Sequence, residues 1–342
     1  MTRALSTRTE NIAASLTVAI DTLAKQMIAE GKDVVSLGAG EPDFPTPKPI
    51  RDAACNAINE GKTRYTAPVG ILEVRKAVCD KLKRDNGLDY APEQIIMTSG
   101  AKHAVFNALA ALINPGDEVI IPAPYWVTYP ELVKWLGGSP VFVQAGIEND
   151  FKITAAQLEA AVTERTKAIL INNPCNPTGS VYTRDELAAL AKVIVEKDIY
   201  CISDEVYEYF VYNGAFTSIA CFEGMPERSI VINGFSKSHC MTGWRIGYDA
   251  APAPIAKIIG KIQGQATHHP SNIAQYAALG ALQMGMGEVE KMQAAFRKRR
   301  DFMVSQASRI LGTPVAAPAG AFYLFAPVAK YYGKKTPAGT TV

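Results

Sequence analysis

From about residue 50 onward, the sequence alternates stretches of helical periodicity with short runs rich in β-branched residues. Strands joined through helices usually run in the same direction, because the chain crosses back over one face of the sheet. The alternation therefore predicts an α/β fold whose large domain has a mostly parallel sheet flanked by helices. Clear helical stretches cover residues 101–113, 184–196 and 255–263, and the strands are expected at residues 94–97, 118–121, 140–143, 167–171, 199–203 and 229–232.

Length, composition and charge restrict the class of protein. The chain has 342 residues, which exceeds the size at which one core usually keeps growing, so a smaller domain should accompany the large one. The apolar fraction of 48% is that of an ordinary folded protein. A formal net charge of +2 creates no field that would favour nucleic acid, and the one dense basic run, residues 297–300, is expected on the solvated face of a helix.

The cysteine and hydropathy patterns bear on location. The six cysteines have no C-x-x-C spacing and are expected to be reduced thiols, with no metal site. No apolar run approaches the roughly 18 residues that suggest a membrane helix, and the N-terminus lacks a signal-like apolar stretch. We therefore expect a cytoplasmic protein that binds neither a membrane nor nucleic acid.

Ionisable residues follow two of the predicted strands, at the edge where α/β sheets usually bind ligands. Asp204 and Tyr207 follow the strand at residues 199–203, and Lys237 follows the strand at residues 229–232. A buried acid at such a place needs a cationic or N–H partner. Each residue taken alone also has a structural explanation, as a helix-start acid or a surface lysine.

Three further residues follow strands or lie in stiff turns. Gly100 opens a helix, whose free N–H groups could bind a phosphate, although a simple Ser-Gly cap is the alternative. Arg245 lies among apolar neighbours and should have an anionic partner, which a structural ion pair would also provide. Asn176 lies in a turn with two prolines, and the requirements of the turn do not explain why an asparagine stands at this position.

One lysine, one acid and a set of phosphate donors together suit pyridoxal phosphate. This cofactor needs a lysine for a Schiff base, a carboxylate that keeps its ring nitrogen protonated, and donors for its phosphate. No other common cofactor needs this combination.

Five motifs occur in order along the chain, namely Ser36-Leu37-Gly38-Ala39-Gly40-Glu41-Pro42-Asp43-Phe44, Arg64-Tyr65-Thr66, Asn176-Pro177-Thr178-Gly179, Ser203-Asp204-Glu205-Val206-Tyr207, and Ser236-Lys237 with Met241-Thr242-Gly243-Trp244-Arg245. In order and spacing they resemble the signatures of class I aminotransferases. The resemblance covers essentially the whole chain. It is to the bacterial aspartate type, including the branch that also transaminates prephenate.

The resemblance implies the fold type I of pyridoxal-phosphate-dependent transferases. Residues 1–43 would form an N-terminal arm and a small-domain segment, residues 44–283 the large cofactor-binding domain, and residues 284–342 an incomplete α+β small domain. The implied function is amino transfer between L-aspartate and 2-oxoglutarate by a ping-pong mechanism through pyridoxamine phosphate. The alternatives are a prephenate or aromatic aminotransferase, another fold-type-I reaction such as that of a β-lyase, and a truncated chain that binds the cofactor without turnover.

The resemblance also assigns roles to residues. The catalytic residues would be Lys237, which carries the cofactor and moves a proton between the substrate Cα and the cofactor C4′, Asp204 at the pyridinium nitrogen, and Tyr207 at the phenolic oxygen. Asn176 would share that oxygen, and Trp126 would stack on the ring. The full set of expected cofactor ligands is Gly100, Ala101, Lys102, Trp126, Asn176, Asp204, Tyr207, Ser236, Lys237 and Arg245, with Tyr65 contributed by the neighbouring subunit of a homodimer.

The amino-acid or 2-oxo-acid substrate would meet a second set of residues. Lys102 and Thr17 would face its distal carboxylate, although a helix-start lysine and an arm threonine are the structural alternatives. Gly40 would offer a backbone N–H near the α-carboxylate. The expected substrate-binding residues are Gly40, Thr17, Lys102, Trp126 and Asn176.

Some positions depart from the family pattern. His268-His269-Pro270 replaces small polar residues that lie near the substrate from the neighbouring subunit, which leaves substrate choice open. Cys175 and His239-Cys240 are also unusual, so the loops round the cofactor should be repacked. No arginine follows Arg309, although the family binds the α-carboxylate with a late arginine. We therefore expect a truncated chain that retains the cofactor but turns over weakly.

Overall fold

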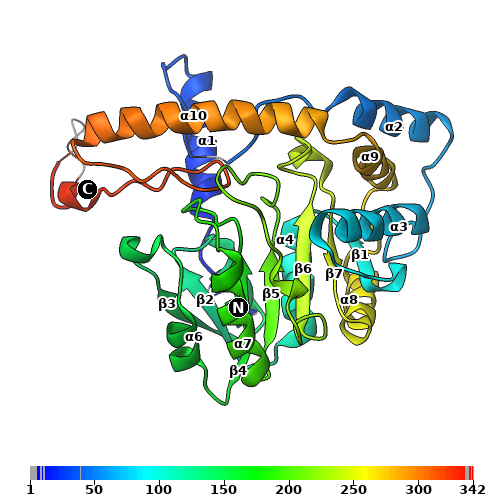
Figure 1. Ribbon diagram of the computed structural model, residues 1–342. Helices are drawn as coiled ribbons and strands as arrows, with labels where there is room; N and C mark the ends of the chain where they lie inside the picture. Colours follow the sequence, from blue (N-terminus) through cyan, green and yellow to red (C-terminus); the bar gives the residue numbers. More distant parts are fainter. Residues whose placement is uncertain are drawn as a thin grey trace, which may run out of the picture.

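The structure is a computed structural model that describes residues 6–7, 10, 12–38, 40–335, 339 and 341. Its centre is a sheet of seven strands in the order β1-β7-β6-β5-β4-β2-β3 (Figure 1). Within the described part of the chain, none of the helices has the length and apolar content that crossing a lipid bilayer requires. The strands are β1 (Ile95–Thr98), β2 (Glu118–Ala123), β3 (Ser139–Gln144), β4 (Thr166–Asn172), β5 (Tyr200–Asp204), β6 (Ser229–Gly234) and β7 (Gly247–Ala250).

Most neighbouring strands are parallel, as the alternation of helices and strands predicts. The pairs β2–β3, β2–β4, β4–β5 and β5–β6 are parallel, whereas β7 runs antiparallel to both of its neighbours, β1 and β6. The six predicted strands are all present. The seventh, β7, is not predicted, because it has only four residues and includes a glycine and an aspartate, which are poor strand formers.

Helices cover both faces of the sheet. One core cluster packs α2, α3 and α9 on one face, and a second packs α4, α5 and α8 against the other. A third cluster packs α6 and α7 near the β3 end. The α-helices are α1 (Leu16–Ala29), α2 (Lys48–Asn59), α3 (Leu72–Lys81), α4 (Ala101–Leu112), α5 (Thr128–Trp135), α6 (Ala155–Ala161), α7 (Arg184–Glu196), α8 (Ala253–Ala266), α9 (Asn272–Gln283) and α10 (Gly287–Leu311).

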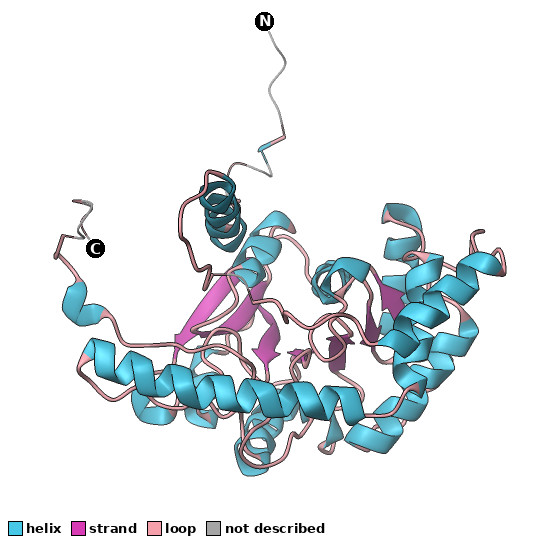
Figure 2. Cartoon of the chain, turned by 90° about the horizontal axis from the view of Figure 1, so that it is seen from above, coloured by secondary structure: helices cyan, strands magenta, loops and turns pink. Residues whose placement is uncertain are grey.

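The long helix α10 lies across the carboxyl ends of the strands, as Figures 1 and 2 show from two sides. Its anchor is an aromatic cluster in which Phe296 stacks on Phe322 at 4.9 Å and packs edge-on against Phe210. The basic run at residues 297–300 belongs to this helix. Its expected solvation is only partly right, since Arg300 donates to the Pro318 carbonyl and only 11% of its side chain is exposed.

The boundary at residue 283 that the resemblance implies coincides with the end of α9. The domain division itself stays a prediction, because the packing clusters do not separate the chain at that residue. Met292 and Phe296 of α10 belong to one cluster with Tyr207, which follows β5.

Asp249 of β7 is a buried acid whose carboxyl group has no hydrogen-bond partner in the described part of the chain. Its side chain is fully buried, and neither carboxyl oxygen has a hydrogen-bond partner among the described residues. Burial raises the pKa of Asp249 well above its ordinary value. A group whose folded pKa is raised contributes stability that is present below its unfolded pKa of about 4 and is lost as the pH rises through the folded pKa. Asp249 should therefore weaken the fold at neutral pH.

We predict that Asp249→Ala raises the free energy of unfolding at pH 7 by about 1–3 kcal/mol, because it removes an unpaired buried polar group. The gain should shrink as the pH falls towards 4, and urea unfolding followed by circular dichroism measures it. Asp249→Asn is the matched control, since it keeps an unpaired polar group of the same size without its titration. An alanine variant less stable than the wild type at pH 7 would contradict the argument.

Candidate active site

All but two of the predicted functional residues meet in one cavity of about 380 Å³ at the carboxyl ends of the parallel strands. β4, β5 and β6 lie side by side, so residues that end them or follow them converge there. The cavity is lined by Thr17, Gly38, Gly40, Ala101, Lys102, Trp126, Tyr129, Asn172, Asn176, Pro177, Asp204, Val206, Tyr207, Ser236, Lys237, Thr242, Arg245 and Tyr323.

Lys237 reaches the cavity from the loop that follows β6. Its Nζ donates a hydrogen bond to the carbonyl oxygen of Gly40 at 2.5 Å, which joins the N-terminal segment to this loop. Burial lowers the pKa of Lys237 to about 8, while the charges of Glu41 and Asp204 raise it in part. An amine with this pKa is partly neutral near physiological pH and can act as a nucleophile or a base.

Asp204 ends β5 and is almost completely buried. Burial raises its pKa to about 6, and hydrogen bonds from Tyr129 and from the Val206 backbone work in the opposite direction. The Tyr129 hydroxyl donates to Oδ2 at 2.7 Å, and the Val206 N–H donates to Oδ1 at 3.3 Å. The expected N–H partner is therefore present, and a tyrosine hydroxyl accompanies it.

Tyr207 follows Asp204 by three residues and is also buried. Its hydroxyl shares a hydrogen bond with the hydroxyl of Tyr323 at 2.5 Å. Burial and the charge of neighbouring groups raise the pKa of Tyr207 well above its ordinary value, so it stays a hydroxyl donor. Asn176 lies at the same wall, and its backbone N–H is held by Oδ1 of Asn172 at 2.6 Å.

A cradle for an anion lies where α4 begins. Gly100 has a φ of +86°, and a Cβ at this position would lie 2.6 Å from Nη2 of Arg245. Only glycine therefore lets the helix start approach the guanidinium. Arg245 donates to the backbone carbonyls of Thr242 at 3.0 Å and Ser99 at 3.4 Å, and no carboxylate among the described residues forms an ion pair with it. The anionic partner that the sequence predicts for Arg245 is not a protein side chain of the described part.

Lys102 and Trp126 lie together on another wall. The Nζ of Lys102 lies 4.8 Å from the centre of the Trp126 ring, as a cation–π pair. Partial burial and the charge of Arg245 lower the pKa of Lys102. Thr17 of α1 contributes to the same cavity, and its hydroxyl bonds with that of Ser15 at 3.0 Å.

Two predicted residues are not on the cavity wall. Gly100 is next to Ala101, which lines the cavity, and Gly100 forms the anion cradle described above. Tyr65 lies on an exposed loop with 88% of its surface free, and its ring packs against His268 at 5.3 Å and His269 at 5.8 Å. It does not contribute to the cavity of its own chain.

Several cavity residues have no predicted role. Tyr323 comes from a distant loop, and nothing in the local sequence indicates that it meets Tyr207. Tyr129 lies three residues after Trp126, and its backbone N–H donates to the Trp126 carbonyl at 3.0 Å, so the two residues belong to one turn before and at the start of α5. The remaining lining residues without a predicted role are Gly38, Asn172, Pro177, Val206 and Thr242.

This donor set fits pyridoxal phosphate. A buried amine and a buried carboxylate face one cavity, an indole ring forms part of its wall, and a glycine helix start with a guanidinium can hold a dianion. Ala39 of the first motif lies outside the described residues.

Comparisons with known proteins agree with this fit. The family model described as aminotransferase class I and II matches residues 32–336. An aspartate/prephenate aminotransferase of Cereibacter sphaeroides is 46% identical over 99% of this chain and 85% of its own length. An aspartate aminotransferase of Geobacillus stearothermophilus is 47% identical over 94% of this chain and 82% of its own length.

Solved structures give the same result for the fold. The aspartate aminotransferase of Rhizobium meliloti has a TM-score of 0.94 at 40% identity. The alignment covers 99% of this chain and 86% of the Rhizobium chain. The enzyme of Thermus thermophilus with maleate has a TM-score of 0.90 at 42% identity, with coverages of 94% and 84%. The predicted fold type is confirmed by this likeness.

We predict that Lys237 of the cofactor-free protein titrates near pH 8 rather than at the ordinary lysine value of 10.5. Competitive acetylation followed by peptide mass spectrometry measures its pKa. Glu41→Gln should lower the pKa further, because the carboxylate stabilises the protonated amine. Glu227→Gln, at the opposite end of the sheet, is the control and should have no effect. Titration of Lys237 at the ordinary value would contradict the burial argument.

Proposed function

Because this chain belongs to the aminotransferases of class I and II, which depend on pyridoxal phosphate, we propose that its substrates are L-aspartate and 2-oxoglutarate. The observation that carries the proposal is Lys102, a cation on the wall of the cavity that also contains Lys237 and Asp204. A dicarboxylic substrate needs a cationic group for its distal carboxylate. The names of the relatives given above, an aspartate and an aspartate/prephenate aminotransferase, support aspartate as the amino donor.

Pyridoxal phosphate, when bound, supplies an aldehyde carbon that combines with amines and a ring that withdraws electrons from the substrate Cα. Lys237 is the residue that we assign to the aldehyde carbon. Its pKa of about 8 leaves part of the amine neutral near neutral pH, as nucleophilic attack requires. Once the amine of the substrate has displaced it from that carbon, the freed Lys237 amine would accept the proton from the substrate Cα and return it at C4′ of the cofactor.

Asp204 would keep the ring nitrogen of the bound cofactor protonated. With a pKa of about 6 it is mostly ionised at neutral pH, so it can pair with a protonated pyridine. Tyr207 and Asn176 would donate hydrogen bonds to the phenolic oxygen, and Trp126 would stack on the ring. Gly100, Ala101, Ser236 and Arg245 would hold the phosphate.

Lys102 and Thr17 bind the distal carboxylate of the substrate in this proposal. Lys102 is already held over the ring of Trp126, which restricts its side chain before the substrate arrives. The Gly40 N–H binds the α-carboxylate, and its carbonyl is occupied by Lys237.

Transamination of prephenate is the second candidate. It is favoured by the relative at 46% identity, which is named for both aspartate and prephenate. The comparison of initial rates with aspartate and 2-oxoglutarate against glutamate and prephenate separates the two candidates.

We also propose that the chain works as a homodimer. Tyr65 projects from an exposed loop and lines no part of the cavity of its own chain. Oligomers of soluble proteins are most often symmetric dimers, in which such a loop can reach the site of the second copy. Tyr65 would then donate a hydrogen bond to the phosphate in that site, beside His268 and His269.

We predict that Lys102→Ala lowers kcat/KM for aspartate by about tenfold to a hundredfold, because a charge-assisted hydrogen bond to the distal carboxylate is lost. The value for alanine should change little, since alanine has no such group. Lys167→Ala, which removes a lysine over Tyr200 away from the cavity, is the matched control. Equal losses for both amino acids would contradict the role of Lys102 in substrate choice.

The dimer proposal predicts complementation between two inactive variants. Lys237→Ala and Tyr65→Ala subunits, unfolded and refolded together, should form hybrid dimers with one intact site. Activity should return to about a quarter of the wild-type value, since half of the dimers are hybrids with one of two sites intact. Separately refolded variants are the control. Failure to regain activity, with dimers verified by light scattering, would place Tyr65 outside the partner's site.

A further inference from the structure

Tyr129 is a buried residue of the cavity that the proposed roles do not use. It lies in the first turn of α5, and only 1% of its surface is exposed. Its hydroxyl donates to Oδ2 of Asp204 at 2.7 Å. Among the described side chains, it is the one hydrogen-bond donor that Asp204 has, beside the backbone N–H of Val206.

The charge of Asp204 depends on few groups. Burial raises its pKa, and the hydrogen bond from Tyr129 is the largest effect in the opposite direction, ahead of the Val206 N–H and of the charge of Lys237. The other ionisable groups that influence Asp204 or are influenced by it are Tyr207, Tyr323 and Cys175. Burial raises the pKa of each of them, so they stay neutral and supply no charge that could replace the hydrogen bond from Tyr129.

Tyr129 is a permanent donor in this position. Burial and the adjacent Asp204 raise the pKa of Tyr129 well above its ordinary value, so it keeps its proton over the working pH range. Its ring also packs edge-on against Trp126, at 5.4 Å and 90°. One side chain therefore contacts both the indole that we assign to the cofactor ring and the carboxylate that we assign to the ring nitrogen.

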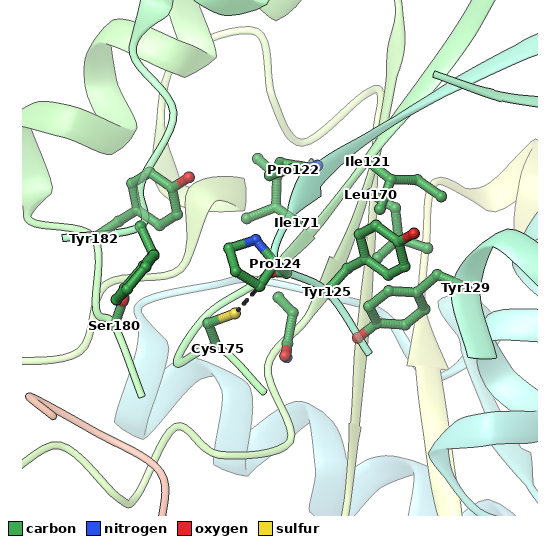
Figure 3. A pocket seen from close by; sticks show the side chains of 12 residues that line it. Ile121, Pro122, Pro124, Tyr125, Tyr129, Leu170, Ile171, Cys175, Ser180 and Tyr182 are labelled. Atoms are coloured by element: carbon green, nitrogen blue, oxygen red, sulfur yellow. Dashed lines mark hydrogen bonds between the residues drawn. The ribbon is translucent and has the colours of Figure 1, made fainter. Parts of the chain in front are cut away.

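The cavity behind Tyr129 is too small to hold bulk water. Figure 3 shows a cavity on this side, lined also by Tyr125, Cys175 and Ser180. Its volume is about 20 Å³, close to the least that one water molecule needs. Tyr129 thus lies between this small cavity and the larger one and lines both.

We propose that Tyr129 is a positioning residue for Asp204, whose O–H keeps the carboxylate ionised and in one orientation for the nitrogen of the cofactor ring. This inference rests on the role proposed above for Asp204. Tyr129 acts through the carboxylate and does not itself touch the reacting atoms. Its loss should therefore change the titration of Asp204 and the affinity for the cofactor, besides the rate.

The test is Tyr129→Phe, which removes one oxygen and keeps the ring. In the cofactor-free protein, the pKa of Asp204, followed by the carboxyl ¹³C resonance, should rise by about one to two units, because a hydrogen bond to a charged group is lost. The dissociation constant of pyridoxal phosphate should rise about tenfold at pH 7.5 and less at pH 9, where the carboxylate is ionised again. Both readouts are independent of turnover.

Tyr125→Phe is the matched control. Tyr125 lines the same small cavity and stacks on Phe142 at 4.9 Å, but it does not bond Asp204. Its variant should leave both readouts unchanged. If Tyr129→Phe behaves like Tyr125→Phe, the inference is overturned.

Asp204→Asn separates this inference from the proposed function. If it weakens cofactor binding and turnover while Tyr129→Phe does not, only the role of Tyr129 is wrong. If Asp204→Asn binds and turns over normally, the proposed role of Asp204 fails and the inference fails with it. If Tyr129→Phe does not fold, an NMR pH titration of the wild type tests the inference instead. The resonance of the Tyr129 hydroxyl proton should shift with a midpoint pH near the pKa of Asp204. A resonance that does not change as Asp204 titrates overturns the inference.

Discussion

The site depends on a carboxylate that is buried at the end of a central strand. Asp204 is 3% exposed, and an ionised group so placed costs several kcal/mol unless donors and a positive charge lie close to it. Tyr129 and the Val206 N–H supply the donors, and Lys237 supplies the charge. These partners come from α5, from the turn after β5 and from the loop after β6. The fold must therefore hold three elements in fixed positions, and the parallel pairing of β2, β4, β5 and β6 does so, because α5 follows β2.

Elements determined by local signals could be predicted from the sequence. The helix expected at residues 184–196 has the same bounds in α7, because Thr183 and Glu186 form a capping box at its start. β7 could not be predicted, since its pairing with β1 and β6 depends on strands that are far away in the sequence. The same is true of the contact between α10 and Phe322. Local patterns indicate that these segments are ordered, but only tertiary packing decides what they touch.

The same distinction holds for the site. Lys237, Asp204 and Asn176 could be selected because they follow strands, and the cavity contains all three. The hydroxyl pair of Tyr207 and Tyr323 could not, because the two residues are separated by a long stretch of chain and meet only through the fold. Tyr65 is exposed and lies outside the cavity of its own chain. The residues around it do not indicate which surface of a second subunit it would contact. Resemblance to a family identifies the residues that lie in its motifs. It does not identify residues outside the motifs that contact them in the folded chain.

Glu205, the residue after Asp204, shows why burial alone does not make a cofactor ligand. Both acids are buried, and burial raises the pKa of Glu205 to about 8, above that of Asp204. Its Oε1 accepts hydrogen bonds from Ser203 at 2.8 Å and Ser218 at 2.6 Å, but it lines no part of the cavity. Glu208 adds a like charge nearby and raises the pKa of Glu205 further. Glu205 is therefore mostly protonated at neutral pH and can serve the core as a neutral hydrogen-bonding group. One step along the chain thus separates an acid that is kept charged by a tyrosine and a lysine from an acid that is kept neutral.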